Sequence, residues 1–249
     1  MMIKPTRAIA LALIDITSWL TPAQVKLYPN ILLASDPPRP PVTDGPTTRK
    51  PAGTRSSCTA LSKLSNNVPF TPLLPGTASN FSGKTVAERP SFWFYIPYQS
   101  NDVASGEFSL EDLTNKKTIY QTSFKLPQIP GFVSIIIPAE NAPLNINTQY
   151  RWTVTIYCNS QTQQSSDDNF VHHEGLVQRV TLSSDLETQL KTATLSQQIA
   201  IYIDNGIWYD ATTNLAEIRR RPNDWVKLLR AMGLEELERE QIAGSVLPP

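Results

Sequence analysis

Residues 150–158 read YRWTVTIYC, and this stretch decides the class of fold. Every second residue is apolar and those between are polar or amphipathic, which is the two-residue period of a β-strand. Such a strand is expected to bury one face and to leave the other largely in water. The buried positions are expected to be Tyr150, Trp152, Val154, Ile156 and Cys158.

Five more segments have the composition of strands and are bounded by Asn, Gly and Pro turn signals. Asn115-Lys116 is predicted to form the tip of a hairpin. Because turns rather than helices join these segments, they are expected to pair antiparallel, and an immunoglobulin-like β-sandwich over residues 58–182 is predicted. The five segments are 92–97, 104–113, 117–124, 132–138 and 171–182.

Residues 144–150 read LNINTQY and resemble the corner of fibronectin type III and related domains. In that corner a tyrosine hydroxyl bonds back to upstream backbone. Tyr150 is therefore predicted to be structural, as are Trp152 in the core and Gly206 at a helix end.

The apolar period changes to that of helices after Leu182. Residues 184–187 and 194–197 have the spacing of capping boxes, and Gly206 is predicted to end or bend the helix that starts at Leu195. A further helix is expected from Asn223-Asp224 to Gly233. The class is therefore α+β: the sandwich is followed by a helical subdomain over 183–240, with a helical hairpin and one or two short helices, and by a loose tail over 241–249.

The first 34 residues resemble an export signal and leader. Lys4 and Arg7 precede the apolar run 8–14, and cleavage is predicted after Ala23, although Asp15 interrupts the run. A Pro-rich linker is expected over 35–57, and no transmembrane segment is expected in the mature chain. Export to the periplasm or cell envelope is predicted; a cytoplasmic location is the alternative.

Cys58 and Cys158 are the two cysteines of the chain. In an exported protein they are expected to form a disulfide, and closing a loop of about 100 residues is worth about 4.7 kcal/mol in the chain-entropy model. The alternative is a pair of thiols in a reducing compartment.

No catalytic, metal or cofactor site is predicted from the residue patterns. His172 and His173 are the two histidines, and as neighbours on a strand they point to opposite faces. Asp167 lies in a segment with the composition of a solvated loop, and the glycines lack the spacing of a phosphate-binding loop. Lys plus Arg equals Asp plus Glu at 22 each, so no nucleic-acid partner is expected.

The aromatic run 92–95 alternates across a strand, so two of its rings are expected on the core face and two on the opposite face. The outward rings are either covered by the C-terminal helices or exposed to bind a partner. The candidate binding surface consists of Trp93, Tyr95, Trp208, Tyr209 and Asp210.

Four motifs together resemble the cyanobacterial family catalogued as domain of unknown function 928, whose members are exported or envelope-associated. They are PAGTR at 51–55, PSFWFYIP at 90–97, YRW at 150–152 and GIWYD at 206–210. The resemblance spans most of the chain and implies that both cysteines and the 206–210 turn belong to the family pattern. It implies no activity or ligand.

We therefore expect a non-catalytic, exported binding or scaffolding module that contacts another envelope protein through aromatic surface. The alternative is a glycan-binding module that uses outward Trp93 or Tyr95 together with Trp208. A third hypothesis is a hydrolase that uses Asp210, Asp167 or His172.

Overall fold

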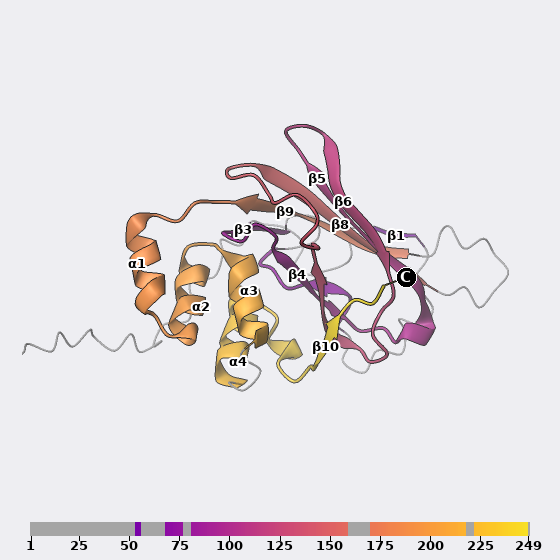
Figure 1. Ribbon diagram of the computed structural model, residues 1–249. Helices are drawn as coiled ribbons and strands as arrows, with labels where there is room; N and C mark the ends of the chain where they lie inside the picture. The colour runs from indigo at the N-terminus through magenta and orange to yellow at the C-terminus, as the bar shows by residue number, and fades with distance from the viewer. Residues whose placement is uncertain (1–52, 56–67, 77–80, 159–169, 218–221, 249) are drawn as a thin grey trace, which may run out of the picture. The chain divides into compact units, whose positions relative to one another are not determined.

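The computed structural model describes residues 53–55, 68–76, 81–158, 170–217 and 222–248 (Figure 1). All of them belong to the compact unit formed by residues 36–249. Two β-sheets stack in a sandwich-like arrangement, and four helices follow in the chain. The class is α+β, as predicted.

Sheet A is the larger sheet and has six strands. In spatial order they are β1 (Gly53–Arg55), β9 (Phe170–Arg179), β8 (Gln149–Cys158), β5 (Val103–Asp112) and β6 (Lys117–Phe124), with β3 (Phe81–Thr85) pairing the later half of β9. Sheet B has four strands, in the order β10 (Ile242–Ser245), β7 (Gly131–Ile136), β4 (Ser91–Ile96) and β2 (Thr71–Pro72).

All six predicted strands are present, each within three residues of its expected ends. Their pairing is not uniformly antiparallel, because β3 runs parallel to β9 and β10 runs parallel to β7. Both parallel pairs join segments that are far apart in sequence, and such long connections are what parallel pairing needs. The short strands β2, β3 and β10 carry too few residues for their period to be read.

Two segments expected to be irregular contain strands. Gly53–Arg55, in the predicted linker, pairs antiparallel with β9 and extends sheet A. Ile242–Ser245, in the predicted loose tail, pairs with β7 and extends sheet B. Backbone hydrogen bonding to an existing sheet edge holds both, and local composition carries no signal of it.

The core lies between the inner faces of the two sheets. Phe94 of β4 packs edge-on against Trp152 of β8 at a ring distance of 5.5 Å, and Phe92 lies 4.8 Å from Phe108 of β5. Trp152 is fully buried, as predicted. The opposite face of sheet B is also covered, since Trp225 packs on Phe132 of β7 at 4.7 Å.

The helices are α1 (Ser184–Thr192), α2 (Leu195–Asp204), α3 (Trp208–Glu217) and α4 (Pro222–Ala231). Thr194 and Gln197 form the predicted capping box of α2, but α1 is capped by Ser183 rather than by Ser184. The α3 helix contacts β3 and β4, and the four helices gather beside these strands in Figure 1. None of the described helices has the length and apolarity to cross a membrane.

The β5–β6 hairpin turns at the predicted tip. Lys116 takes a left-handed conformation with φ of 51°, and the Asp112 carboxylate accepts the backbone N–H groups of Thr114 and Asn115 at 2.8 and 3.0 Å. These hydrogen bonds hold the pKa of Asp112 below its usual value. Local side-chain chemistry is sufficient to form this turn.

The tyrosine corner is present. The Tyr150 hydroxyl accepts the backbone N–H of Asn145 at 2.8 Å, and the ring of Tyr150 is buried. Asn147 at this corner takes a φ of 59°, and its N–H donates to the Arg179 carbonyl at 2.7 Å. Tyr150 therefore closes the loop before β8, and Asn147 ties this loop to the end of β9.

Candidate functional site

Three of the four aromatic residues expected to form a binding surface are buried. Tyr95, Trp208 and Tyr209 are 2%, 7% and 3% exposed, and Trp93 is half-buried. Tyr95 packs on Phe132, which in turn contacts Trp225. For Tyr95, coverage by the C-terminal helices is therefore the alternative that the structure has, while Trp93 is only partly covered.

The turn at Gly206 connects α2 to α3 and contains a pair of nested hydrogen bonds. The Gly206 N–H donates to the Ile203 carbonyl at 3.0 Å, and the Ile207 N–H donates to the Tyr202 carbonyl at 2.8 Å. This is the Schellman arrangement, which requires a left-handed residue, and Gly206 has a φ of 71°. Gly206 is therefore structural, as predicted.

Tyr209 connects the helices to both sheets. Its hydroxyl accepts the Trp152 indole N–H at 2.7 Å and donates to the Leu176 carbonyl at 3.0 Å, while its ring lies 5.4 Å from that of Phe92. Burial raises the pKa of Tyr209, so the hydroxyl stays protonated and can make both bonds.

Gly83 of β3 makes this close approach sterically feasible. A Cβ at position 83 would lie 3.1 Å from the Tyr209 ring and 3.2 Å from the Trp208 Cβ. These distances are shorter than ordinary van der Waals contact, so a larger residue at position 83 would push α3 away from β3.

Asp210 holds the turn between β3 and β4. The Lys84 N–H of β3 donates to the Gly206 carbonyl at 2.9 Å. The Asp210 carboxylate accepts a hydrogen bond from the Val86 N–H at 3.1 Å and another from the Thr85 side chain. Burial raises the pKa of Asp210 despite these hydrogen bonds. The carboxylate also raises the pKa of Tyr202, after the larger effect of that ring's own burial.

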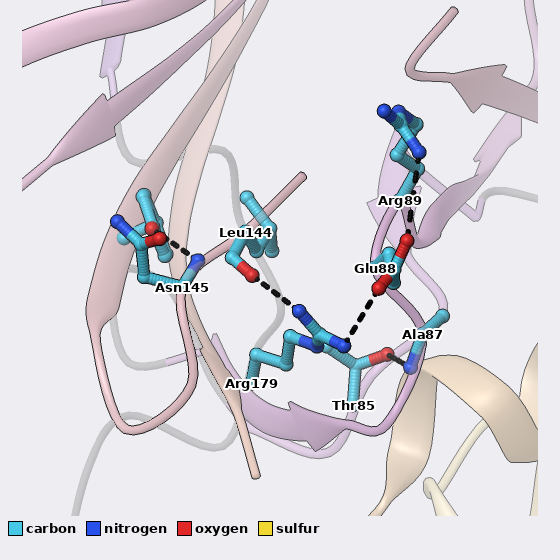
Figure 2. Close-up of polar contacts among 8 residues, drawn as sticks. Thr85, Ala87, Glu88, Arg89, Leu144, Asn145 and Arg179 are labelled. Carbon is cyan, nitrogen blue, oxygen red and sulfur yellow. Dashed lines mark hydrogen bonds and ion pairs between the residues drawn. The ribbon is translucent and has the colours of Figure 1, made fainter. Parts of the chain in front are cut away.

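Figure 2 shows further polar contacts at the same β3–β4 turn, made by Arg179 at the end of β9. Its guanidinium donates to the Leu144 carbonyl at 2.7 Å and to the Glu88 carboxylate at 3.2 Å, and Arg89 lies 3.8 Å from Glu88. Because the Glu88 side chain is 59% exposed, these ion pairs are expected to add little stability. The bond to the Leu144 carbonyl ties the tyrosine-corner loop to this turn.

The two histidines lie on opposite faces of β9, as predicted. His173 is fully buried and its Nε2 lies 2.7 Å from the Phe70 carbonyl, whereas His172 is half-buried on the other face. Within the described parts of the chain, no three His, Cys, Asp or Glu side chains gather as metal ligands would. Cys158 is buried at the end of β8; Cys58 and Asp167 lie outside the described residues.

We define the outer face of sheet A as the side chains of β5, β8 and β9 that point away from sheet B. They alternate with the buried residues of the same strands, and most are half-buried. Hydroxyl, carboxylate and aromatic groups predominate. The members are Glu107, Ser109, Glu111, Arg151, Thr153, Thr155, Tyr157, Phe170, His172, Glu174 and Leu176. The sequence predicts these strands but does not identify this face as a site, because an alternating pattern indicates only that one face of a strand is exposed to solvent.

A Tyr209→Phe substitution is expected to lower the free energy of unfolding by about 1–3 kcal/mol, because the Trp152 N–H and Leu176 carbonyl would lose their buried partner. Urea unfolding followed by tryptophan fluorescence measures the change. Tyr202→Phe, the same change on the half-buried face of α2, is expected to cost about 0.5 kcal/mol or less. Equal costs for the two variants would contradict the assigned role of Tyr209.

An Asp210→Asn substitution is expected to alter how stability depends on pH. The pKa of Asp210 in the folded chain lies above its usual value of 3.8, so the folded state holds this proton more tightly than the unfolded state. This group therefore makes the unfolding free energy fall as pH rises from about 4 through the folded pKa. The variant lacks this contribution and retains an oxygen that accepts from Val86.

The measurement is a series of urea-unfolding curves between pH 4 and pH 8 for both proteins. Relative to the wild type, the variant is expected to gain stability as pH rises within this window. A difference between the two proteins that is the same at every pH, or that changes in the opposite direction, would refute the raised pKa.

A model of the family described as Domain of Unknown Function (DUF928) matches residues 50–242, well over half of the 249-residue chain. The matched range contains the turn at 206–210, its partners Trp152 and Phe92, and the outer face of sheet A. Comparison with curated proteins finds no significant match.

Proposed function

The chain belongs to the family described as Domain of Unknown Function (DUF928), and we propose that it is a non-catalytic, exported binding module of the cell envelope. Its contact surface in this proposal is the outer face of sheet A. The observation that carries the proposal is the packing of the 206–210 motif. Its aromatic rings are buried, where they hold the helices to the sheets. The binding role expected of them therefore falls to a different surface.

The outer face of sheet A is suited to binding because the inner face of the same strands is packed in the core. Each of its side chains sits between buried neighbours on the same strand, and Trp152, Val154 and Val177 anchor β8 and β9 in the core with no exposed area. A surface preorganised in this way loses little conformational entropy when it binds. The rows of side chains across adjacent strands give it a fixed spacing of about 5 Å.

Two occupants were considered from the sequence, an envelope protein and a glycan. The protein contact is expected on the candidate surface of Trp93, Tyr95, Trp208, Tyr209 and Asp210, and the glycan on outward Trp93 or Tyr95 together with Trp208. Tyr95, Trp208 and Tyr209 are buried. The same two classes now apply to the outer face of sheet A. The hydrolase hypothesis has less support, because the Asp210 carboxylate accepts hydrogen bonds from the β3–β4 turn and serves as a structural acceptor.

Export and a Cys58–Cys158 disulfide are part of the proposal. Arg55 of β1, Phe170 of β9 and Tyr157 of β8 lie in one row, and β1 and β8 run in the same direction because each is antiparallel to β9. Cys158 follows Tyr157 by one residue and Cys58 follows Arg55 by three. The chain therefore leaves β1 and β8 at the same end of the sheet, and these two strands are roughly 10 Å apart.

The finer features of the fold are also proposals. An immunoglobulin-like topology is supported by the tyrosine corner at Tyr150. A helical hairpin of α2 and α3 is supported by their mutual contact and by the short Gly206 turn between them.

Peptide mapping without reductant, on protein from its native cells, tests the compartment. The expected result is a mature N-terminus close to residue 24 and a linked pair of peptides that contain Cys58 and Cys158. An intact Met1 together with two alkylated thiols would overturn export and the bridge.

Site-specific photocrosslinking in intact cells tests the contact surface. Benzoylphenylalanine replaces Thr153, at the centre of the outer face, or Thr192, an exposed threonine of α1 that serves as the matched control. Light is expected to produce crosslinked species from position 153 at a yield at least about fivefold higher than from position 192, because a bound partner covers the outer face. Equal yields, or no adduct from position 153, would refute the assignment.

A further inference from the structure

We propose that one corner of the outer face of sheet A, formed by Tyr157, Phe170 and His172 with Glu107 and Thr155 beside them, binds an uncharged sugar ring of a polysaccharide. This inference rests on the proposed function, because it names the occupant of the same surface. None of these five residues was among the aromatic candidates that the sequence suggested.

Three rings form a continuous strip at this corner. Tyr157 of β8 and Phe170 of β9 are cross-strand partners with ring centroids 6.3 Å apart, and His172 lies two residues along β9 with its ring 5.7 Å from Phe170. All three residues are half-buried, and the Nδ1 atom of His172 is itself buried. On β1, Gly53 is the register partner of His172 and Arg55 is that of Phe170, so the neighbour without a side chain lies beside His172 alone.

Polar groups flank the strip at short range. The Tyr157 hydroxyl donates to one carboxylate oxygen of Glu107 at 3.0 Å, which fixes the carboxylate beside the rings and leaves its other oxygen to accept from a ligand. Thr155 lies between Glu107 and His172 in the same row across the sheet. Burial, and then the Glu107 carboxylate, raises the pKa of Tyr157, so its hydroxyl remains a donor at neutral pH.

This combination matches the two sides of a pyranose ring. The C–H face of a sugar is apolar and packs on aromatic rings, while its rim of hydroxyls needs acceptors and donors in the same plane. At this corner Tyr157 and Phe170 lie in one row of the sheet, and the next row holds His172, Thr155 and Glu107. The following row continues with Ser109, Thr153 and Glu174, which would extend the polar contacts along a chain of sugars.

The charges of the outer face favour an uncharged ligand. Glu111 lies directly opposite Arg151, and Glu174 is one row away on the neighbouring strand. The carboxylates are thus interspersed with a cation, and no single sign of charge extends over the face. Among the side chains of β5, β8 and β9, the three glutamates would repel a polyanion and Arg151 would repel a polycation. Arg55 of β1 adds a second cation to the row of Phe170.

The direct test is titration of the ¹⁵N-labelled full chain with hexasaccharides, followed by NMR. The probes are β-1,4-linked glucose, α-1,4-linked glucose and β-1,4-linked N-acetylglucosamine hexasaccharides, with an oligogalacturonate of the same length as a charged comparison. At least one uncharged probe is expected to shift the amide signals of residues 153–157 and 170–174. The charged probe is expected to bind at least about tenfold more weakly.

Variants assign the effect to the corner. Phe170→Ala is expected to raise the dissociation constant about tenfold through loss of the stacking ring, and Tyr157→Phe about threefold, since it keeps a ring but releases Glu107. Tyr202→Phe on α2 is the matched control and is expected to bind as the wild type does. Because Tyr157→Phe removes only a half-exposed hydroxyl, it tests the site even if the Phe170 variant is poorly folded.

The outcomes separate this inference from the proposed function. No shift with any uncharged hexasaccharide, or unchanged affinity in both corner variants, would overturn the sugar site. If position 153 then still crosslinks to a protein, the contact surface stands with a protein as its occupant. Loss of both saccharide binding and crosslinking from position 153 would refute the contact surface as well.

Discussion

The arrangement of the helices on the sheets depends on two hydrogen bonds made by the Tyr209 hydroxyl. It accepts from the Trp152 indole and donates to the Leu176 carbonyl, so one group satisfies a buried side chain of β8 and the backbone of β9. An unpaired polar group in such a place would cost more than a good hydrogen bond gains. The helices that follow β9 are therefore held in one position, rather than resting on the sandwich through apolar contact alone.

The turn between β3 and β4 connects α3 to other parts of the domain. Asp210 of α3 accepts a hydrogen bond from the backbone of this turn. Arg179 connects the turn to the tyrosine-corner loop (Figure 2). Residues from four separate parts of the chain thus share one short segment of backbone. Packing of this kind explains why the motif at 206–210 combines a left-handed glycine, two large aromatic residues and a carboxylate: each has a structural partner.

The outer face of sheet A has the opposite character. Its side chains are half-buried, mixed in charge and rich in hydroxyl groups, and the interior of the domain does not require these particular residues. Glu107 and Tyr157 nevertheless bond to each other across strands, next to a strip of three rings. Because packing in the core fixes the positions of β8 and β9, the side chains on their outer face are held in place to contact a ligand.

The sequence by itself determined the elements whose signals are local. Alternation predicted β8 and its neighbours, the Thr194 box predicted the start of α2, and the Asn-Lys tip and the corner at Tyr150 followed from turn chemistry. Tertiary structure alone decided the rest. Whether Trp208 and Tyr209 face water or the core, whether 53–55 and 242–245 become strands, and which rings meet at Tyr157 and Phe170 all depend on segments more than 10 residues away. The hydrophobic period of a segment indicates which of its residues are buried. It does not indicate which other segment packs on them, because that depends on contacts between residues far apart in the sequence.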